Sequence, residues 1–157
     1  MNSWLRSNYS YLAGSIILKA NLIMRWMKWA GLIAAILLIV SCFTTWITIP
    51  SKDIIVSGVD ATGTSFGKPG YFNLLMTLFF IVFTLIPRIW AKRVNLLVTA
   101  MNVAWAIRNY FIISACQGGD CPEKHSGLFL MLAASLLMLI SSLFPDIKLP
   151  AQQKETP

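Results

Sequence analysis

Apolar residues along this chain gather in four long runs, which are separated by short polar stretches. The runs cover about residues 29–49, 71–90, 94–115 and 127–144. Each run is close to the ~20 residues that an α-helix needs to cross ~30 Å of hydrocarbon. The pattern therefore predicts an all-α membrane protein, with a bundle of four transmembrane helices within residues 26–145.

The segments that flank the four runs have other patterns. Polar positions in residues 1–25 recur every few residues, which favours an amphipathic helix on the inner membrane surface. An alternative is that Met24 is the natural start and residues 1–23 are a dispensable extension. The outer loop, residues 50–70, has a β-branched run followed by glycine-rich turns, which predicts a small β-like hairpin. Residues 146–157 are predicted to be a disordered cytoplasmic tail.

The composition agrees with a membrane protein. Hydrophobic residues make up 57% of the chain and charged residues only 12%, whereas soluble domains carry about 25% charged residues. The net charge of +7 does not indicate nucleic-acid binding, because the basic residues flank apolar runs instead of gathering on one soluble face. We expect the lipid bilayer, and not nucleic acid, to be the chain's main partner.

The distribution of charge predicts which loops lie inside the cell. With the N-terminus inside, the cytoplasmic segments hold nine basic and two acidic residues, and the outer loops hold three lysines and four acids. This asymmetry predicts a multi-pass inner-membrane protein with both termini in the cytoplasm. The nine basic residues are Arg6, Lys19, Arg25, Lys28, Arg88, Lys92, Arg93, Lys148 and Lys154.

Each run carries a stripe of small or weakly polar residues at alternating steps of three and four. The clearest stripe is Asn95, Thr99, Asn102 and Asn109 in the third run, and Asn73 lies in phase on the second. Small residues let helices approach closely, and Asn and Thr hydrogen-bond between helices. We expect the stripes to pack together. The alternative is a polar path for a solute, although no Asp, Glu or His lies in any run to relay protons.

Arg108 is a basic residue inside the third run, and it lies near the outer end of that run. Its long side chain is expected to reach the outer interface, and Trp105 shares its helix face as a cation–π partner. We expect Arg108 to anchor the helix. The alternative is that Trp105, Arg108 and Tyr110 form a site for a quinone or a lipid head group.

Two cysteines lie in the outer loop between the third and fourth runs. Cys116 and Cys121 are predicted to form a disulfide, because the outer side is oxidising and Gly118 and Gly119 permit a tight turn. A metal site is an alternative, but His125 adds only a third ligand. A redox pair is another, although Cys-x4-Cys is not the usual Cys-x-x-Cys. No metal and no cofactor are expected.

Several stretches resemble known membrane proteins. "SCFTTWITIP", "SGVDATGTSFGKPGYF", "AWAIRNY" and a C-x4-C-P followed by "GLFLMLAASLLMLISSLFPD" are similar to small four-helix inner-membrane proteins of bacteria. The resemblance covers about Met24 to Asp146 and implies a membrane bundle without bringing catalytic residues. The claudin-like plan is set aside, because the first outer loop lacks its Trp…Gly-Leu-Trp…Cys…Cys signature.

These observations favour a non-enzymatic protein that serves as an accessory or scaffold subunit of a larger membrane complex. Its partners would be other membrane proteins or further copies of the chain. One alternative is a quinone-, lipid- or small-molecule-binding membrane protein that uses the asparagine stripe and Arg108. Another is a subunit of a channel or transporter formed by oligomerisation.

Overall fold

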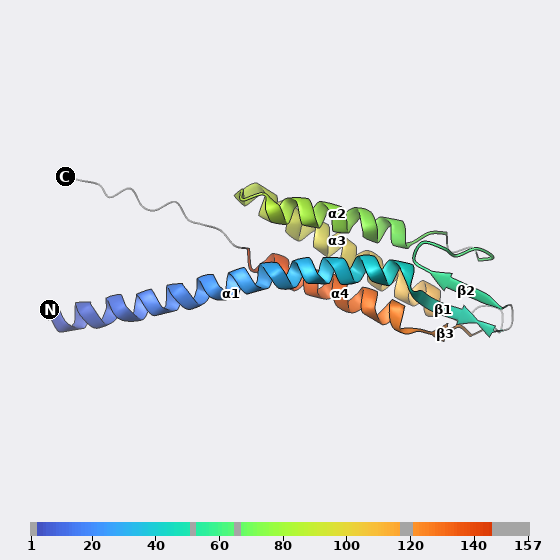
Figure 1. Ribbon diagram of the computed structural model, residues 1–157, viewed down its shortest axis with the longest axis horizontal. Helices are drawn as coiled ribbons and strands as arrows, with labels where there is room; N and C mark the ends of the chain where they lie inside the picture. The colour runs from blue at the N-terminus through green and yellow to red at the C-terminus, as the bar shows by residue number, and fades with distance from the viewer. Residues whose placement is uncertain (1–2, 51–52, 65–66, 117–120, 146–157) are drawn as a thin grey trace.

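The structure is a computed structural model that describes residues 3–50, 53–64, 67–116 and 121–145. Its four helices are α1 (Ser3–Phe43), α2 (Gly70–Leu85), α3 (Ile89–Ser114) and α4 (Ser126–Leu143). They lie side by side along one long axis, and α1 continues well past the others at one end (Figure 1). The prediction of a mostly helical chain is confirmed. The predicted tail, residues 146–157, lies outside the described residues.

A small sheet covers the other end of the helices (Figure 1). Its strands are β1 (Thr45–Ile49), β2 (Ile54–Ser57) and β3 (Glu123–Lys124), in the order β2-β1-β3 with antiparallel pairing. Ile47 pairs with Val56 on one side and with Lys124 on the other. The prediction of a β-like outer loop is therefore confirmed, and the loop before α4 adds a third strand to it.

The first apolar run was expected to be helical as far as residue 49, and this was wrong at its outer end. α1 ends at Phe43, and Thr45–Ile49 form the central strand of the sheet. The residues there are Thr, Trp, Ile, Thr and Ile, which favour a pleated, half-buried strand over a helix. Pairing with β2 and β3 decides the conformation, because hydrophobicity alone does not distinguish a strand from a helix end.

The break between α2 and α3 also lies at a different position from the one that the apolar runs predict. The second helix was expected over residues 71–90 and the third from residue 94, but α2 ends at Leu85 and α3 begins at Ile89. Pro87 is the cause, because proline disfavours a helical conformation in the residue before it. Ile86 is accordingly extended, with ψ of 117°.

The N-terminal segment is helical, as expected, but it is not a separate helix. Ser3–Phe43 form one continuous helix of 41 residues that includes the first apolar run. The helix has no break near residue 25, where the surface segment was expected to end. Within the described residues, three helical stretches are long and apolar enough to cross a membrane: Leu22–Phe43, Ile89–Ser114 and Ser126–Leu143. α2, with 16 residues, is shorter.

The small and polar stripes do face one another, and the large apolar side chains face both inward and outward. α1 packs on α4 and α2, and α3 packs on α2 and α4. Leu38, Phe80, Met131 and Met138 fill the spaces between the helices. The exposed apolar side chains form a belt around the bundle and include Ile33, Ile36, Leu75, Leu78, Leu97, Phe111, Leu136 and Leu137.

Trp46 is the fully buried side chain that joins the sheet to the helices. Its indole Nε1 donates a hydrogen bond of 2.7 Å to the backbone oxygen of Ser41. Gly58 and Gly127 approach the ring so closely that a Cβ on either would lie within 3.1 Å of it. The sheet, Trp46 and these two glycines together are called the cap below.

Candidate functional site

Four polar residues of α3 lie inside the bundle, as the stripe predicted. Asn95, Thr99, Asn102 and Asn109 are all at least 96% buried, and they face neighbouring helices. Asn95 Nδ2 donates to Thr84 Oγ1 of α2 at 3.0 Å. Thr99 Oγ1 lies 2.9 Å from Ser142 Oγ of α4. In its lower half, near the start of α3, the stripe therefore binds three helices together by hydrogen bonds.

The upper half of the stripe is different, because its amides have no such partners. Both polar atoms of Asn73 and of Asn102, and the Nδ2 of Asn109, are buried without a hydrogen bond within the described residues. Leaving a buried polar group unpaired costs about 1–3 kcal/mol. Asn73 belongs to α2 and the other two residues to α3, and these helices pack on each other. The core thus contains amides whose hydrogen-bonding capacity is unused within the described residues.

Of the three residues proposed for a head-group site, Trp105 and Arg108 lie together, and Tyr110 lies apart from them. Arg108 is exposed, with its guanidinium 5.0 Å from the centre of the Trp105 ring. Trp105 faces α2, where Nε1 donates to the backbone oxygen of Pro69 at 3.1 Å. Tyr110 faces the opposite flank, against Phe129 of α4 and beneath the ammonium of Lys124. Because each helical residue turns by ~100°, Tyr110 is about 140° away from Trp105.

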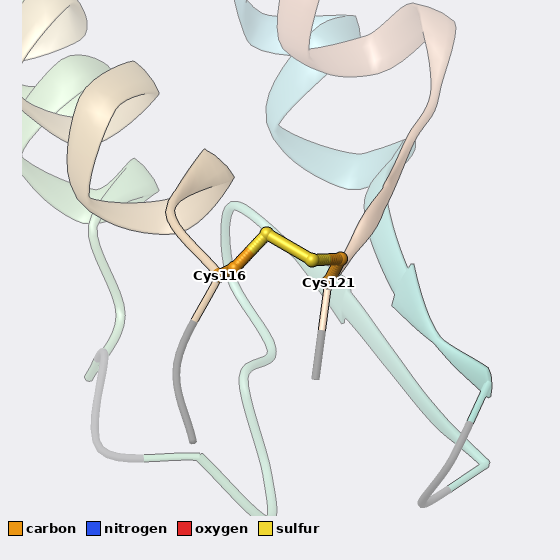
Figure 2. Close-up of a disulfide and its surroundings, with 2 residues drawn as sticks. All are labelled: Cys116 and Cys121. Carbon is orange, nitrogen blue, oxygen red and sulfur yellow. A yellow bond between two sulfur atoms is a disulfide. The ribbon is translucent and has the colours of Figure 1, made fainter. Parts of the chain in front are cut away.

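Cys116 and Cys121 form the predicted disulfide, with their Cα atoms 4.3 Å apart. Figure 2 shows that it joins the end of α3 to the segment that leads to β3 and α4. His125 is engaged elsewhere, because its Nε2 lies 2.8 Å from Thr48 Oγ1 and its backbone N–H donates to Trp46 O. Among the described residues, no group of three His, Cys, Asp or Glu side chains is placed to hold a metal ion.

The outer loop contains one carboxylate with a perturbed pKa. Hydrogen bonds from the hydroxyl and the backbone N–H of Thr62 lower the pKa of Asp60 below its ordinary value of 3.8. Asp60 is exposed and its partners belong to the same turn. Its role is therefore to fix the loop that follows β2.

A pocket that the sequence did not reveal opens at the end of the bundle opposite the cap. All four helices contribute polar residues to it, and its cavity volume is about 20 Å³, room for about one water molecule. Phe144 and Pro145 lie along its rim. No stretch of sequence predicts such a pocket, because its residues come from four separate helices. The polar lining residues are Lys28, Thr84, Lys92, Asn95, Ser141 and Ser142.

The hydrogen bonds around this pocket hold its wall in place. Lys92 Nζ donates to the backbone oxygen of Thr84 at 2.7 Å, which bridges the break between α2 and α3. Ser141 Oγ donates to the backbone oxygen of Met27 at 2.8 Å, which joins α4 to α1. The Oδ1 of Asn95 is buried and has no hydrogen-bond partner within the described residues. Hydrogen bonds from Lys92 and Ser141 thus link the helices that line the pocket.

Comparisons of the chain with protein-family models, with curated proteins and with solved structures found no match.

Proposed function

We propose that this chain is a four-span inner-membrane protein that serves as an accessory or scaffold subunit of a larger membrane complex. The observation that carries the proposal is the length of α1, which extends far beyond the bundle to which it belongs (Figure 1). The proposal has three parts: the number of spans, their orientation, and the role of the free part of α1.

The packing of α2 supports a fourth span. α2 lies between α1 and α3, which both have membrane-spanning length and hydrophobicity, so it occupies the same layer. Its 16 residues extend about 24 Å, a few ångströms short of the ~30 Å hydrocarbon thickness. A mismatch of that size is accommodated by local thinning of the bilayer. Exposed Leu75, Leu78 and Val82 give α2 a lipid-facing surface.

The positions of the charges support an orientation with both termini in the cytoplasm. The start of α1 and the end of α4 lie toward the same end of the bundle (Figure 1). Arg25, Lys28 and Lys92 also lie at that end, whereas Asp53 and Asp60 lie beside the sheet. Positive charge accumulates on the cytoplasmic side of membrane proteins. The cap would then face the outside, where its disulfide is stable.

The free part of α1 is the proposed contact with the partner. The hydrogen bond from Ser141 to Met27 marks the level at which the bundle ends. Residues 3–26 would extend a further ~36 Å, about 1.5 Å per residue. Sharp kinks in helices need Pro, Gly or a comparable disturbance, and residues 15–30 contain no Pro or Gly. A continuous helix of this length favours docking on a protein over lying flat on the membrane.

The charge of α1 indicates what kind of partner it would bind. The helix contains four basic residues and no acidic residue. Complementary charge steers association and suppresses incorrect partners. We therefore propose a partner that presents an acidic surface at the cytoplasmic face of the membrane. The basic residues are Arg6, Lys19, Arg25 and Lys28.

The proposal is tested on the full chain in native membranes. A photoreactive amino acid is placed at Tyr11 on the free part of α1, with a control at Leu97, which is exposed on the bundle. After mild solubilisation, we expect one protein to crosslink at Tyr11 in a fixed ratio to this chain, and none of it at Leu97. Crosslinks to lipid alone at both positions would contradict the proposal and favour a surface helix.

A pair of charge reversals sharpens this test. Lys19→Glu changes an exposed residue on the free part of α1, and Arg93→Glu makes the same change on the exposed side of α3. We expect Lys19→Glu to weaken the complex on a native gel and Arg93→Glu to leave it intact. A monomer that carries a bound quinone, or a ring of this chain alone, would instead favour a ligand-binding protein or a channel subunit, and would overturn the scaffold proposal.

A further inference from the structure

Three basic side chains near the sheet end of the bundle lie over aromatic rings: Lys68 over Tyr71, Arg108 over Trp105 and Lys124 over Tyr110. Lys68 acts electrostatically on the carboxylate of Asp60, and Lys124 belongs to the sheet. Arg108 differs from both, because it lies in the apolar helix α3 and has no carboxylate or hydrogen-bond acceptor as a partner within the described residues. The described part of the chain therefore leaves the charge of Arg108 uncompensated.

Arg108 lies on a face of α3 that would contact lipid. Met101, Ala104 and Phe111 share this face by their helical spacing, and all three are exposed. Phe111 is 67% exposed and Ile107, next to Arg108, is 43% exposed. An uncompensated charge on such a face is costly in hydrocarbon, so arginines in membrane helices take a partner or reach the interface. For a lipid-facing guanidinium, the nearest anion is a lipid phosphate.

The level of the guanidinium along the bundle matches that of the lipid phosphates. Trp105 Nε1 donates to the backbone oxygen of Pro69, directly before α2 begins at Gly70. The indole under Arg108 therefore reaches the level at which the apolar residues of α2 begin. Arg108 is also six residues before Ser114, the end of α3, which is about 9 Å along the axis. The whole of α3 extends about 39 Å, more than the ~30 Å of hydrocarbon, so this level lies near the head groups.

The indole of Trp105 restricts the guanidinium without using its donors. The ring is held by its hydrogen bond to Pro69 and by Phe72, whose ring centre lies 4.6 Å away. A cation over an aromatic face is attracted by the ring, and the guanidinium keeps its N–H donors for other partners. Guanidinium groups bind phosphate through two parallel N–H···O bonds. Arg108 is therefore restricted before it binds, which lowers the entropy lost on binding.

We propose that Arg108, held over Trp105, binds the phosphate of one phospholipid in the leaflet on the sheet side of the membrane. Two of its N–H groups donate to two phosphate oxygens, and Ile107 and Phe111 contact the acyl chains. The site goes beyond the proposed scaffold function, because it does not involve the free part of α1. It requires that the bundle crosses the membrane, but it does not depend on which end faces the cytoplasm.

Solid-state NMR on the full chain tests the contact directly. The chain is labelled with ¹³C at the guanidinium carbons of its arginines and placed in bilayers of phosphatidylglycerol. Dephasing of these carbons by lipid phosphorus is then measured, and the Arg108 signal is identified as the one lost in Arg108→Lys. We expect lipid phosphorus to dephase the Arg108 signal. An Arg108 signal without dephasing would overturn the proposal, and this result does not depend on how a variant folds.

Lipid retention by variants locates the site. Nanodiscs contain equal amounts of phosphatidylglycerol and of a galactosyl diacylglycerol with the same acyl chains but no phosphate, and native mass spectrometry measures which lipid stays on the protein. Arg108→Gln should lower the preference for phosphatidylglycerol by about five-fold, the effect of one basic residue at a lipid surface. Lys124→Gln also removes a cation over an aromatic ring at this end and should leave the preference unchanged. Equal losses in the two variants would show general attraction to positive charge and would overturn the site.

A third variant tests the paired hydrogen bonds. Arg108→Lys keeps the charge but loses the planar pair of donors. We expect it to lose part of the preference for phosphatidylglycerol. A preference equal to that of the parent would contradict the paired contact.

Two further arms separate the lipid from other anions. Displacement of the retained lipid by millimolar inorganic phosphate would show that Arg108 takes phosphate from solution, which contradicts the lipid source. Asp120 lies in the loop after α3, outside the described residues. A gain of phosphatidylglycerol in Asp120→Asn would show that the chain's own carboxylate pairs with Arg108, and would also overturn the proposal. No change in either arm is the expected result.

Discussion

The two ends of this bundle are built on opposite plans. At one end, the cap closes the helices with a sheet, a fully buried Trp46 and close glycine contacts, and the disulfide lies beside it. At the other end, the helices separate around an open pocket with two lysines, and α1 continues alone. The difference predicts that the cap contributes more to stability than the open end does.

The largest expected effect comes from removing Trp46. Trp46→Ala empties a fully buried position beneath the sheet and leaves the backbone oxygen of Ser41 without its donor. We expect the free energy of unfolding to fall by about 3–5 kcal/mol. Unfolding of the detergent-solubilised protein by a denaturing detergent measures this. Trp29→Ala, at a position 60% exposed, should change stability by less than about 0.5 kcal/mol. Equal losses in the two variants would contradict the contrast between the ends.

The disulfide should contribute the next largest effect. Replacing both Cys116 and Cys121 by Ser opens a very small ring, which in the chain-entropy model lowers stability by roughly 2 kcal/mol. Unfolding of the variant and of the oxidised parent measures the difference. No difference between the variant and the oxidised parent would contradict this prediction.

Replacing an unpaired asparagine between the two ends should increase stability, whereas the two changes above decrease it. Asn102 has both polar atoms buried and unpaired within the described residues, so Asn102→Leu should raise the free energy of unfolding by about 1–2 kcal/mol. Asn95→Leu is the matched control, because it removes a hydrogen bond to Thr84 and should lower stability. A loss in Asn102→Leu would reveal an internal water or ligand on the amide, and would favour the polar path over simple packing.

The smallest effect concerns pH at the outer loop. The folded pKa of Asp60 is below 3.8 because Thr62 hydrogen-bonds the carboxylate. A lowered pKa gives stability that is present above the unfolded value, near 3.8, and is lost as pH falls through the folded pKa. Hydrogen exchange at the Thr62 amide should therefore be constant from neutral pH to about 4, after allowance for the intrinsic rate, and should increase only below that. Asp60→Asn should remove this acid-dependent change, and an increase that begins well above pH 4 would contradict the assignment.

The sequence predicted the helical architecture because long apolar runs are a strong and local signal. It also predicted the disulfide, since Cys116 and Cys121 are close in the chain, and it predicted the buried face of α3 from the spacing of Asn95, Asn102 and Asn109. These features depend on periodicity or on short separations.

Features that depend on distant pairing were not predicted. Thr45–Ile49 continues the apolar run of the helix before it, and its pairing with β2 and β3 decides that it is a strand. Tyr110 was grouped with Trp105 by nearness in sequence, although the helical angle between them already places the two on different flanks. The pocket was missed because Lys28 and Lys92 meet only after four helices have assembled.

The pairing of β1 with β3 also constrains the order of events during biogenesis. Thr48 and His125, which are 77 residues apart, meet across this pairing. In the proposed topology, a chain that inserts helix by helix would bring β1 to the outer side early, but its partner β3 would arrive only with the last loop. The sheet then completes late, whereas the two cysteines, which belong to one short loop, need not wait for α1. In the proposed four-span topology, closing of the sheet would thus mark the insertion of the last helix.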